Sequence, residues 1–184
     1  MRSLLVVAVC TCACVTYVSA TPYVDQSNLE YWAGDVQAAN SATLVVDFGS
    51  DNHFAFGYRW DGEATSWDML SAVCSAGNLD ETHTGDVEIG FGVMVKSISY
   101  GDFAMDNDDT SEPGDTWLVY WDSIDGNHWS VPWTGISSNP VADGSWNGWT
   151  ATPTDNWPGQ QPIPEPTTLL VLVAGALGLA VRKR

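Results

Sequence analysis

The densest cluster of reactive side chains in this sequence is a run of carboxylates between residues 102 and 115. Oxygen ligands held close together are what Ca²⁺ prefers. The EF-hand pattern fails, because with Asp106 at its first position the sixth is Ser111 instead of Gly and the twelfth is Trp117 instead of Glu. Two hypotheses stay open, a solvated acidic loop and an irregular calcium site. The acidic residues of the run are Asp102, Asp106, Asp108, Asp109, Glu112 and Asp115.

Nucleophiles and general bases do not form any arrangement typical of an enzyme. The three histidines, His53, His83 and His128, are too dispersed for zinc. Cys74 is the only cysteine after residue 20 and falls on an apolar helical face, so we expect a buried small side chain. No GxSxG, P-loop or dinucleotide-binding pattern occurs. We therefore expect a non-enzymatic protein that binds no cofactor other than, at most, calcium. The alternative is a glycan-active hydrolase that uses two of the many carboxylates.

Tryptophan is the residue type best suited to binding. All ten tryptophans follow residue 20, and seven fall between residues 117 and 157. Exposed indoles stack on the apolar faces of sugars, so a carbohydrate-binding module of an exopolysaccharide layer is a second alternative. We assign Trp60, Trp117 and Trp121 to the core, and strand alternation places Trp146 and Trp149 on opposite faces. The candidates for an exposed ligand platform are Trp129, Trp133 and Trp149.

The charge of the chain excludes two classes of partner. The segment between Thr21 and Ile163 contains 22 acidic residues, while Arg59 and Lys96 are its only basic ones, which gives a net charge of −20. Nucleic acids and anionic lipids both require cations on the protein. We therefore expect no nucleic-acid partner. Self-repulsion that maintains solubility is the simplest role for such a charge.

Hydrophobic periodicity predicts one β-rich α+β domain over residues 21–151 with one main helix. A hairpin is expected over 41–48 and 53–60, and a second over 117–121 and 127–131 around the turn at 124–126. The segment 87–100 reads as a strand with Val93, Val95 and Ile98 buried, and 146–150 reads as a final strand. The proline-rich segment 152–163 is expected to be a linker.

The expected helix begins at Thr65 or Ser66 and is closed by Gly77. Its apolar face is predicted from the spacing of four residues, which are Trp67, Leu70, Val73 and Cys74.

Both ends of the chain read as export signals. Residues 1–20 combine Arg2, an apolar run and a small-residue cleavage site at Ala20, which indicates a signal peptide. Cys14 leaves lipidation open as an alternative. At the other end Pro164-Glu165-Pro166 precedes an apolar segment over 167–181 and a basic stop, Arg182-Lys183-Arg184. A fifteen-residue helix is roughly 22 Å long, so it spans the roughly 30 Å hydrocarbon layer only with snorkelling ends or local thinning.

This C-terminal order resembles the PEP-CTERM sorting signal of Gram-negative bacteria. The resemblance implies an exosortase partner, export, and a precursor held in the membrane by residues 167–181 before it reaches the cell surface or the extracellular polysaccharide of a biofilm. The body resembles more weakly a bacterial surface domain of unknown function that is related to the C-terminal domain of transcobalamin and intrinsic factor. The segments that carry this resemblance are 67–70, 95–98, 117–121, 135–137 and 143–146.

Overall fold

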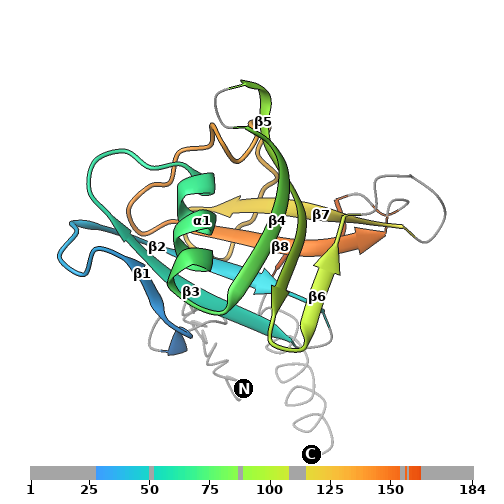
Figure 1. Cartoon of the computed structure of the whole chain (residues 1–184), viewed down its shortest axis with the longest axis horizontal. Coiled ribbons are helices and arrows are strands. Elements are labelled where there is room, and N and C mark those ends of the chain that lie inside the picture. The colour runs from blue at the N-terminus through green and yellow to red at the C-terminus, as the bar shows by residue number, and fades with distance from the viewer. Residues whose placement is uncertain are drawn as a thin grey trace, which may run out of the picture.

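The computed structural model describes residues 28–49, 52–86, 89–107, 115–153, 156 and 158–162. The predicted signal peptide and the predicted membrane helix over 167–181 lie outside these residues. Within them no helix has the length and apolar character needed to cross a membrane. The elements in chain order are β1 Trp32–Gly34, β2 Asn40–Asp47, β3 His53–Trp60, α1 Ser66–Ala76, β4 Leu79–Asp86, β5 Ile89–Tyr100, β6 Phe103–Asp106, β7 Thr116–Ser123 and β8 Trp146–Pro153 (Figure 1).

Two sheets and the helix form the described domain. The main sheet has the order β1-β3-β2-β8-β7, and the small sheet has the order β4-β5-β6. Strand β8 lies between two strands that are distant in sequence, parallel to β2 and antiparallel to β7. Helix α1 and the small sheet lie together in front of the main sheet (Figure 1) and share one hydrophobic core with it. The α+β prediction is confirmed for the described residues.

The main sheet buries side chains on both of its faces. Its inner face, which α1 and the small sheet cover, carries Leu44, Phe56 and Trp149. Its outer face carries Val45 and Trp146 in a second cluster. Successive strand residues point to opposite faces. Trp146 and Trp149, three positions apart in β8, therefore lie on opposite faces, as the sequence predicted. The outer cluster also contains Ala55, Val119, Trp121 and Trp129.

Helix α1 begins where the sequence predicted, but its buried face is rotated. Thr65 is the N-cap and forms a capping box with Asp68. The buried residues are Ser66, Met69, Leu70 and Val73, whereas Trp67 and Cys74 are only half-buried. The predicted stripe was therefore displaced by about one position, because the core that α1 contacts comes from two separate sheets.

Strand β5 confirms the burial of Val93, Val95 and Ile98. The spacing breaks strict alternation, and the pairing explains why. His83 pairs with Val95 while Thr82 pairs with Ser97, so the register shifts by one residue at Lys96. The partners β4 and β6 were not predicted, since the β4 sequence is mostly polar and half of β6 is exposed.

The predicted second hairpin is wrong in its second arm. The turn after β7 exists, but residues 127–131 form no strand and pair with β7 through a single bridge, in which the backbones of Asp122 and Ser130 exchange hydrogen bonds of 2.8 and 2.9 Å. The partner of β7 is β8, which pairs with it from Thr116–Pro153 to Ser123–Trp146. Strand β8 is longer than predicted, so Thr152 and Pro153 lie in the sheet.

Candidate ligand-binding site

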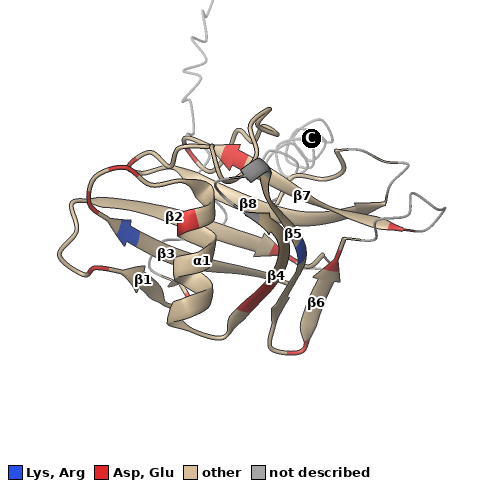
Figure 2. Ribbon diagram, turned by 45° about the horizontal axis from the view of Figure 1, so that its top comes forward, with Lys and Arg blue, Asp and Glu red and all other residues tan. Residues whose placement is uncertain are grey.

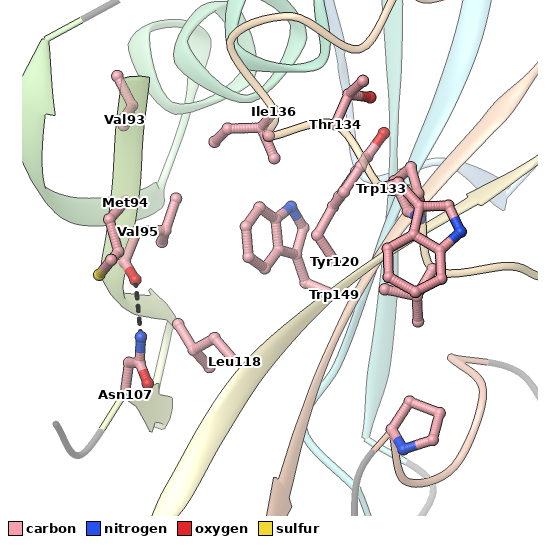
Figure 3. Close-up of a pocket in the computed structure, with 14 residues that line it drawn as sticks. Val93, Met94, Val95, Asn107, Leu118, Tyr120, Trp133, Thr134, Ile136 and Trp149 are labelled. Carbon is pink, nitrogen blue, oxygen red and sulfur yellow. Dashed lines mark hydrogen bonds between the residues drawn. The ribbon is translucent and has the colours of Figure 1, made fainter. Parts of the chain in front are cut away.

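A cavity of about 420 Å³ opens between the small sheet and the inner face of the main sheet near its β7 edge. Figure 3 shows β5 on one side and the segment carrying Trp133, Thr134 and Ile136 on the other, with Trp149 between them. Among the described residues, none that lines it carries a charge. The walls are mainly aliphatic and aromatic, from Val93, Met94, Val95, Leu118, Val131, Ile136 and Trp149.

The first turn of α1 fixes the cavity wall formed by residues 133–136. The amide of Ser66 donates to the carbonyl of Asn139 at 2.9 Å, and the amide of Trp67 donates to the carbonyl of Ile136 at 3.1 Å. The first amides of a helix have no partner inside the helix. The loop therefore caps α1 and is held in place by it.

A buried hydroxyl and amide network joins this loop to β7. The hydroxyls of Tyr120 and Ser66 lie 2.6 Å apart, and Asn139 Nδ2 donates to Tyr120 at 2.8 Å. Burial raises the pKa of Tyr120, so its ring stays neutral. Thr134 Oγ1 in turn donates to Asn139 Oδ1 at 3.2 Å. Tyr120 and Thr134, which line the cavity, are thus hydrogen-bonded to partners behind the cavity wall.

The mouth of the cavity carries one fully exposed indole. The side chain of Trp133 has a relative exposure of 104%, and Met94 on the opposite rim is half exposed. The other predicted platform residues are buried, Trp129 at 7% on the outer face and Trp149 at 4% in the cavity wall. The three therefore do not form one flat platform, because strand and loop geometry sends them to different faces. Trp60 and Trp121 are buried as predicted, and Trp117 is half-buried.

The acidic run is not gathered into a metal site in the described part of the chain. Asp102 and Asp106 are exposed and Asp115 is half-buried, while Asp108 and Asp109 lie outside the described residues. Among described residues no group of three or more His, Cys, Asp or Glu side chains is placed to hold one metal ion. Calcium binding by this run stays a prediction.

One Ser, Asp and His set occurs in the turn after β7, but its order is unsuited to nucleophilic catalysis. Asp125 lies between the other two, with Ser123 Oγ donating to it at 3.2 Å and His128 Nδ1 at 2.7 Å. In a catalytic triad the histidine must contact the serine. The backbone amide of Asn127 and then His128 lower the pKa of Asp125, so this carboxylate organises a turn.

The lone cysteine is equally unsuited to act as a nucleophile. Burial raises the pKa of the Cys74 thiol to about 12, with Glu81 and Asp80 adding to the shift. The thiolate is the nucleophilic form of cysteine. The side chain is therefore a protonated group that packs against the hydrophobic core, although it is half-buried and not fully buried as predicted.

The surface around these features is strongly acidic. In Figure 2 most of the coloured ribbon is red, with blue on β3 and β5, the strands that carry Arg59 and Lys96. The guanidinium of Arg59 lies 4.2 Å from the ring centre of Trp32 and donates to the carbonyl of Val36 at 3.0 Å. Neither cation lines the cavity.

The comparison with protein families assigns the C-terminal end. Residues 162–184 match the PEP-CTERM protein-sorting motif. The match covers the predicted Pro164-Glu165-Pro166 and the basic residues Arg182, Lys183 and Arg184, so the predicted sorting signal is confirmed. The chain is therefore an exosortase-sorted protein, exported as a membrane-anchored precursor and processed for the cell surface. The comparison with curated proteins finds no match. The weaker resemblance of the body stays a prediction.

Proposed function

We propose that the body of this exosortase-sorted protein is a non-catalytic module that binds a neutral sugar unit of an extracellular polysaccharide. The observation that carries the proposal is the fully exposed indole of Trp133 at the mouth of an uncharged cavity. An exposed indole that is continuous with an apolar cavity forms the kind of contiguous apolar surface that marks ligand-binding grooves. The flat ring offers a stacking surface for a sugar, and the cavity behind it is large enough for part of one.

Polar groups near the mouth suit hydroxyl recognition. Asn107 lines the cavity, and its amide reaches the carbonyl of Val95 only at 3.5 Å, at the outer limit of a hydrogen bond. Its carboxamide can both donate and accept. Thr134 lies beside Trp133 and adds a hydroxyl. A ligand stacked on Trp133 would meet both kinds of group.

The charge distribution favours neutral over acidic polysaccharides. The segment from residue 21 to residue 163 has a net charge of −20, and no described cation lines the cavity. A uronate-rich chain would be repelled over several ångströms at moderate salt. A neutral ligand avoids this repulsion, which is why we include neutrality in the proposal.

The chemistry of the lining supports binding without catalysis. In the part of the chain that the structure describes, the residues that line the cavity include no carboxylate, histidine, cysteine or lysine. General acid–base and nucleophilic mechanisms require such groups within hydrogen-bond reach of the substrate.

We further propose that the source is a Gram-negative bacterium, and that residues 167–181 hold the precursor in the membrane until processing.

The aliphatic walls favour a second candidate, a ligand with an acyl chain. Val93, Val95, Leu118 and Ile136 together form a surface suited to methylene groups. Such a ligand would fill the interior of the cavity, whereas a sugar would occupy mainly its mouth. The two candidates therefore depend on different residues.

Binding of the surface-released protein to immobilised neutral glycans, acidic glycans and long-chain acyl compounds tests the proposal. We expect retention on neutral glycans, and Trp133→Ala should weaken it on the order of tenfold. The matched control is Trp32→Ala, since Trp32 is also exposed but lies on β1 away from the cavity. Binding of acyl compounds alone would favour the second candidate. An equal loss in the Trp32 variant would refute a site at the cavity.

A further inference from the structure

The segment that leads into the sorting motif is packed on the outer face of the main sheet. Pro162 is buried over Gly148 of β8. A Cβ atom on Gly148 would overlap the ring of Pro162 and would lie 2.8 Å from Cζ3 of Trp129. The absence of a side chain at Gly148 therefore creates the seat that Pro162 and Trp129 share.

The chain reaches this seat by reversing direction directly after β8. The amide of Asn156 donates to the carbonyl of Pro153 at 2.9 Å, and Thr152 Oγ1 donates to the carbonyl of Asn156 at 3.2 Å. Gly159 has a φ of +81°, and a Cβ atom there would overlap the Thr152 side chain. Residues 158–162 thus turn back toward the strand that precedes them, which is a docked arrangement and not that of a free linker.

This docking brings the sorting signal close to the folded body. The PEP-CTERM match begins at Pro162 itself. Glu165 follows three residues later, so it cannot lie more than about 11 Å from the docked proline. A membrane enzyme that acts on this motif has to admit the chain on both sides of it. With Pro162 packed on Gly148, the chain immediately before Pro164-Glu165-Pro166 is part of the domain surface and is not free to enter the enzyme.

We propose that residues 158–162 form a latch, and that the exosortase processes the form in which this latch has left the outer face. Gly148, Trp129 and Gly159 are then positioning residues for the sorting reaction, although they lie outside the motif. The folded body then slows its own release, because the processing rate follows the fraction of molecules in which the segment is undocked. Opening of a short surface segment is a local equilibrium that does not require global unfolding.

A pulse-chase measurement of the full-length precursor in exosortase-carrying cells tests the latch. Gly159→Ala should destabilise the docked form of residues 158–162, because alanine is strained at this φ and its Cβ would overlap the Thr152 side chain. We expect processing to become about tenfold faster, the scale of exposing one buried apolar ring. Gly62→Ala is the matched control, because Gly62 has a similar φ of +75° but open space around it. It should be processed at the wild-type rate.

A second variant separates an effect on the latch from an effect on folding. Inserting Gly-Ser-Gly-Ser after Ile163 leaves the docked segment intact but moves Pro164-Glu165-Pro166 away from the body. This insertion should also accelerate processing, and Gly159→Ala should add nothing to it. Hydrogen exchange at residues 159–161 should be faster in the Gly159 variant. Faster exchange with an unchanged processing rate, or fully additive effects of the two changes, would overturn the proposal.

Discussion

The hydroxyl oxygen of Tyr120 lies 2.6 Å from Oγ of Ser66, although the two residues are 54 positions apart. Tyr120 belongs to β7 and Ser66 opens α1, so this contact joins the main sheet to the helix that covers it. Asn139 Nδ2 donates to both oxygens, at 2.8 and 3.2 Å. The wall of the cavity, the start of the helix and the edge strand are therefore held by one buried group.

Replacing Tyr120 by Phe removes this group with little change of shape. The amide of Asn139 then loses its nearest acceptor, and we expect the free energy of unfolding to fall by about 1–2 kcal/mol. Chemical denaturation followed by tryptophan fluorescence measures the change. Tyr58→Phe is the control, because Tyr58 is also buried and its ring stacks on Trp60 at 5.1 Å, with no hydroxyl network of this kind. An equal cost for both variants would contradict the role of the network.

Gly77 lies too close to Tyr31 to carry a side chain. A Cβ atom there would overlap the ring of Tyr31. The Tyr31 hydroxyl donates to the carbonyl of Val73 and accepts from the amide of Leu79. We expect Gly77→Ala to lower the free energy of unfolding by about 1–3 kcal/mol.

A double-mutant cycle checks this explanation. In a Tyr31→Ala background the obstructing ring is absent, so Gly77→Ala should cost little. The same cost in both backgrounds would show that the glycine acts through its backbone freedom instead.

The local elements of this fold were predictable because each has a local signal. The first hairpin follows from alternation on either side of a Gly-Ser-Asp-Asn turn, and β2 pairs with β3 from Asn40–Trp60 to Asp47–His53. The capping box at Thr65 is likewise encoded within four residues. Strand β8 shows the limit, since its partners β2 and β7 are set by long-range packing. No local pattern could show that β8, and not residues 127–131, is the strand that pairs with β7.

The site was less predictable than the fold for a similar reason. Trp129 and Trp133 are four residues apart in one loop, yet one is buried against Gly148 and the other is fully exposed. Burial here depends on which loop residue meets a glycine on the sheet. The cavity itself was not predicted, because it is bounded by β5, β7, β8 and the loop at 131–136, which no periodicity brings together.

The pH dependence of stability should contain a contribution from Asp122. Burial raises its pKa above 3.8, although the amide of Asn147 donates to it at 3.0 Å. A raised pKa in the folded state means that the ionised form opposes folding, so stability falls as pH rises through the folded pKa. Asp122→Asn should therefore raise the free energy of unfolding at neutral pH, by less than about 1 kcal/mol because the group is half exposed.

The gain should vanish below about pH 4, where Asp122 is protonated in both states. Asp102→Asn is the matched control, since it removes the same charge from an exposed position. A gain of equal size in both variants would mean that net charge, and not burial, is responsible. Equilibrium denaturation as a function of pH measures both.

Added salt should stabilise the surface-released protein through screening of its large negative charge. The melting temperature should rise alike with Ca²⁺, Mg²⁺ and Na⁺ at equal ionic strength, because repulsion among exposed carboxylates is reduced by any cation. Differential scanning fluorimetry measures the shift. A larger rise with Ca²⁺ that disappears in a variant with Asp106→Asn and Asp108→Asn would instead establish a calcium site in the acidic run.

Sorting should depend on the carboxylate of Glu165. This residue is the only acidic one in the matched motif, between two prolines that restrict the backbone on either side. With Glu165→Ala we expect the precursor to accumulate in the membrane fraction, while the body, whose described residues end at Pro162, folds normally. Mass spectrometry of the wild-type surface protein should find a form that lacks Arg182-Lys183-Arg184. A released protein that retains these three residues would show that sorting proceeds without cleavage at the motif.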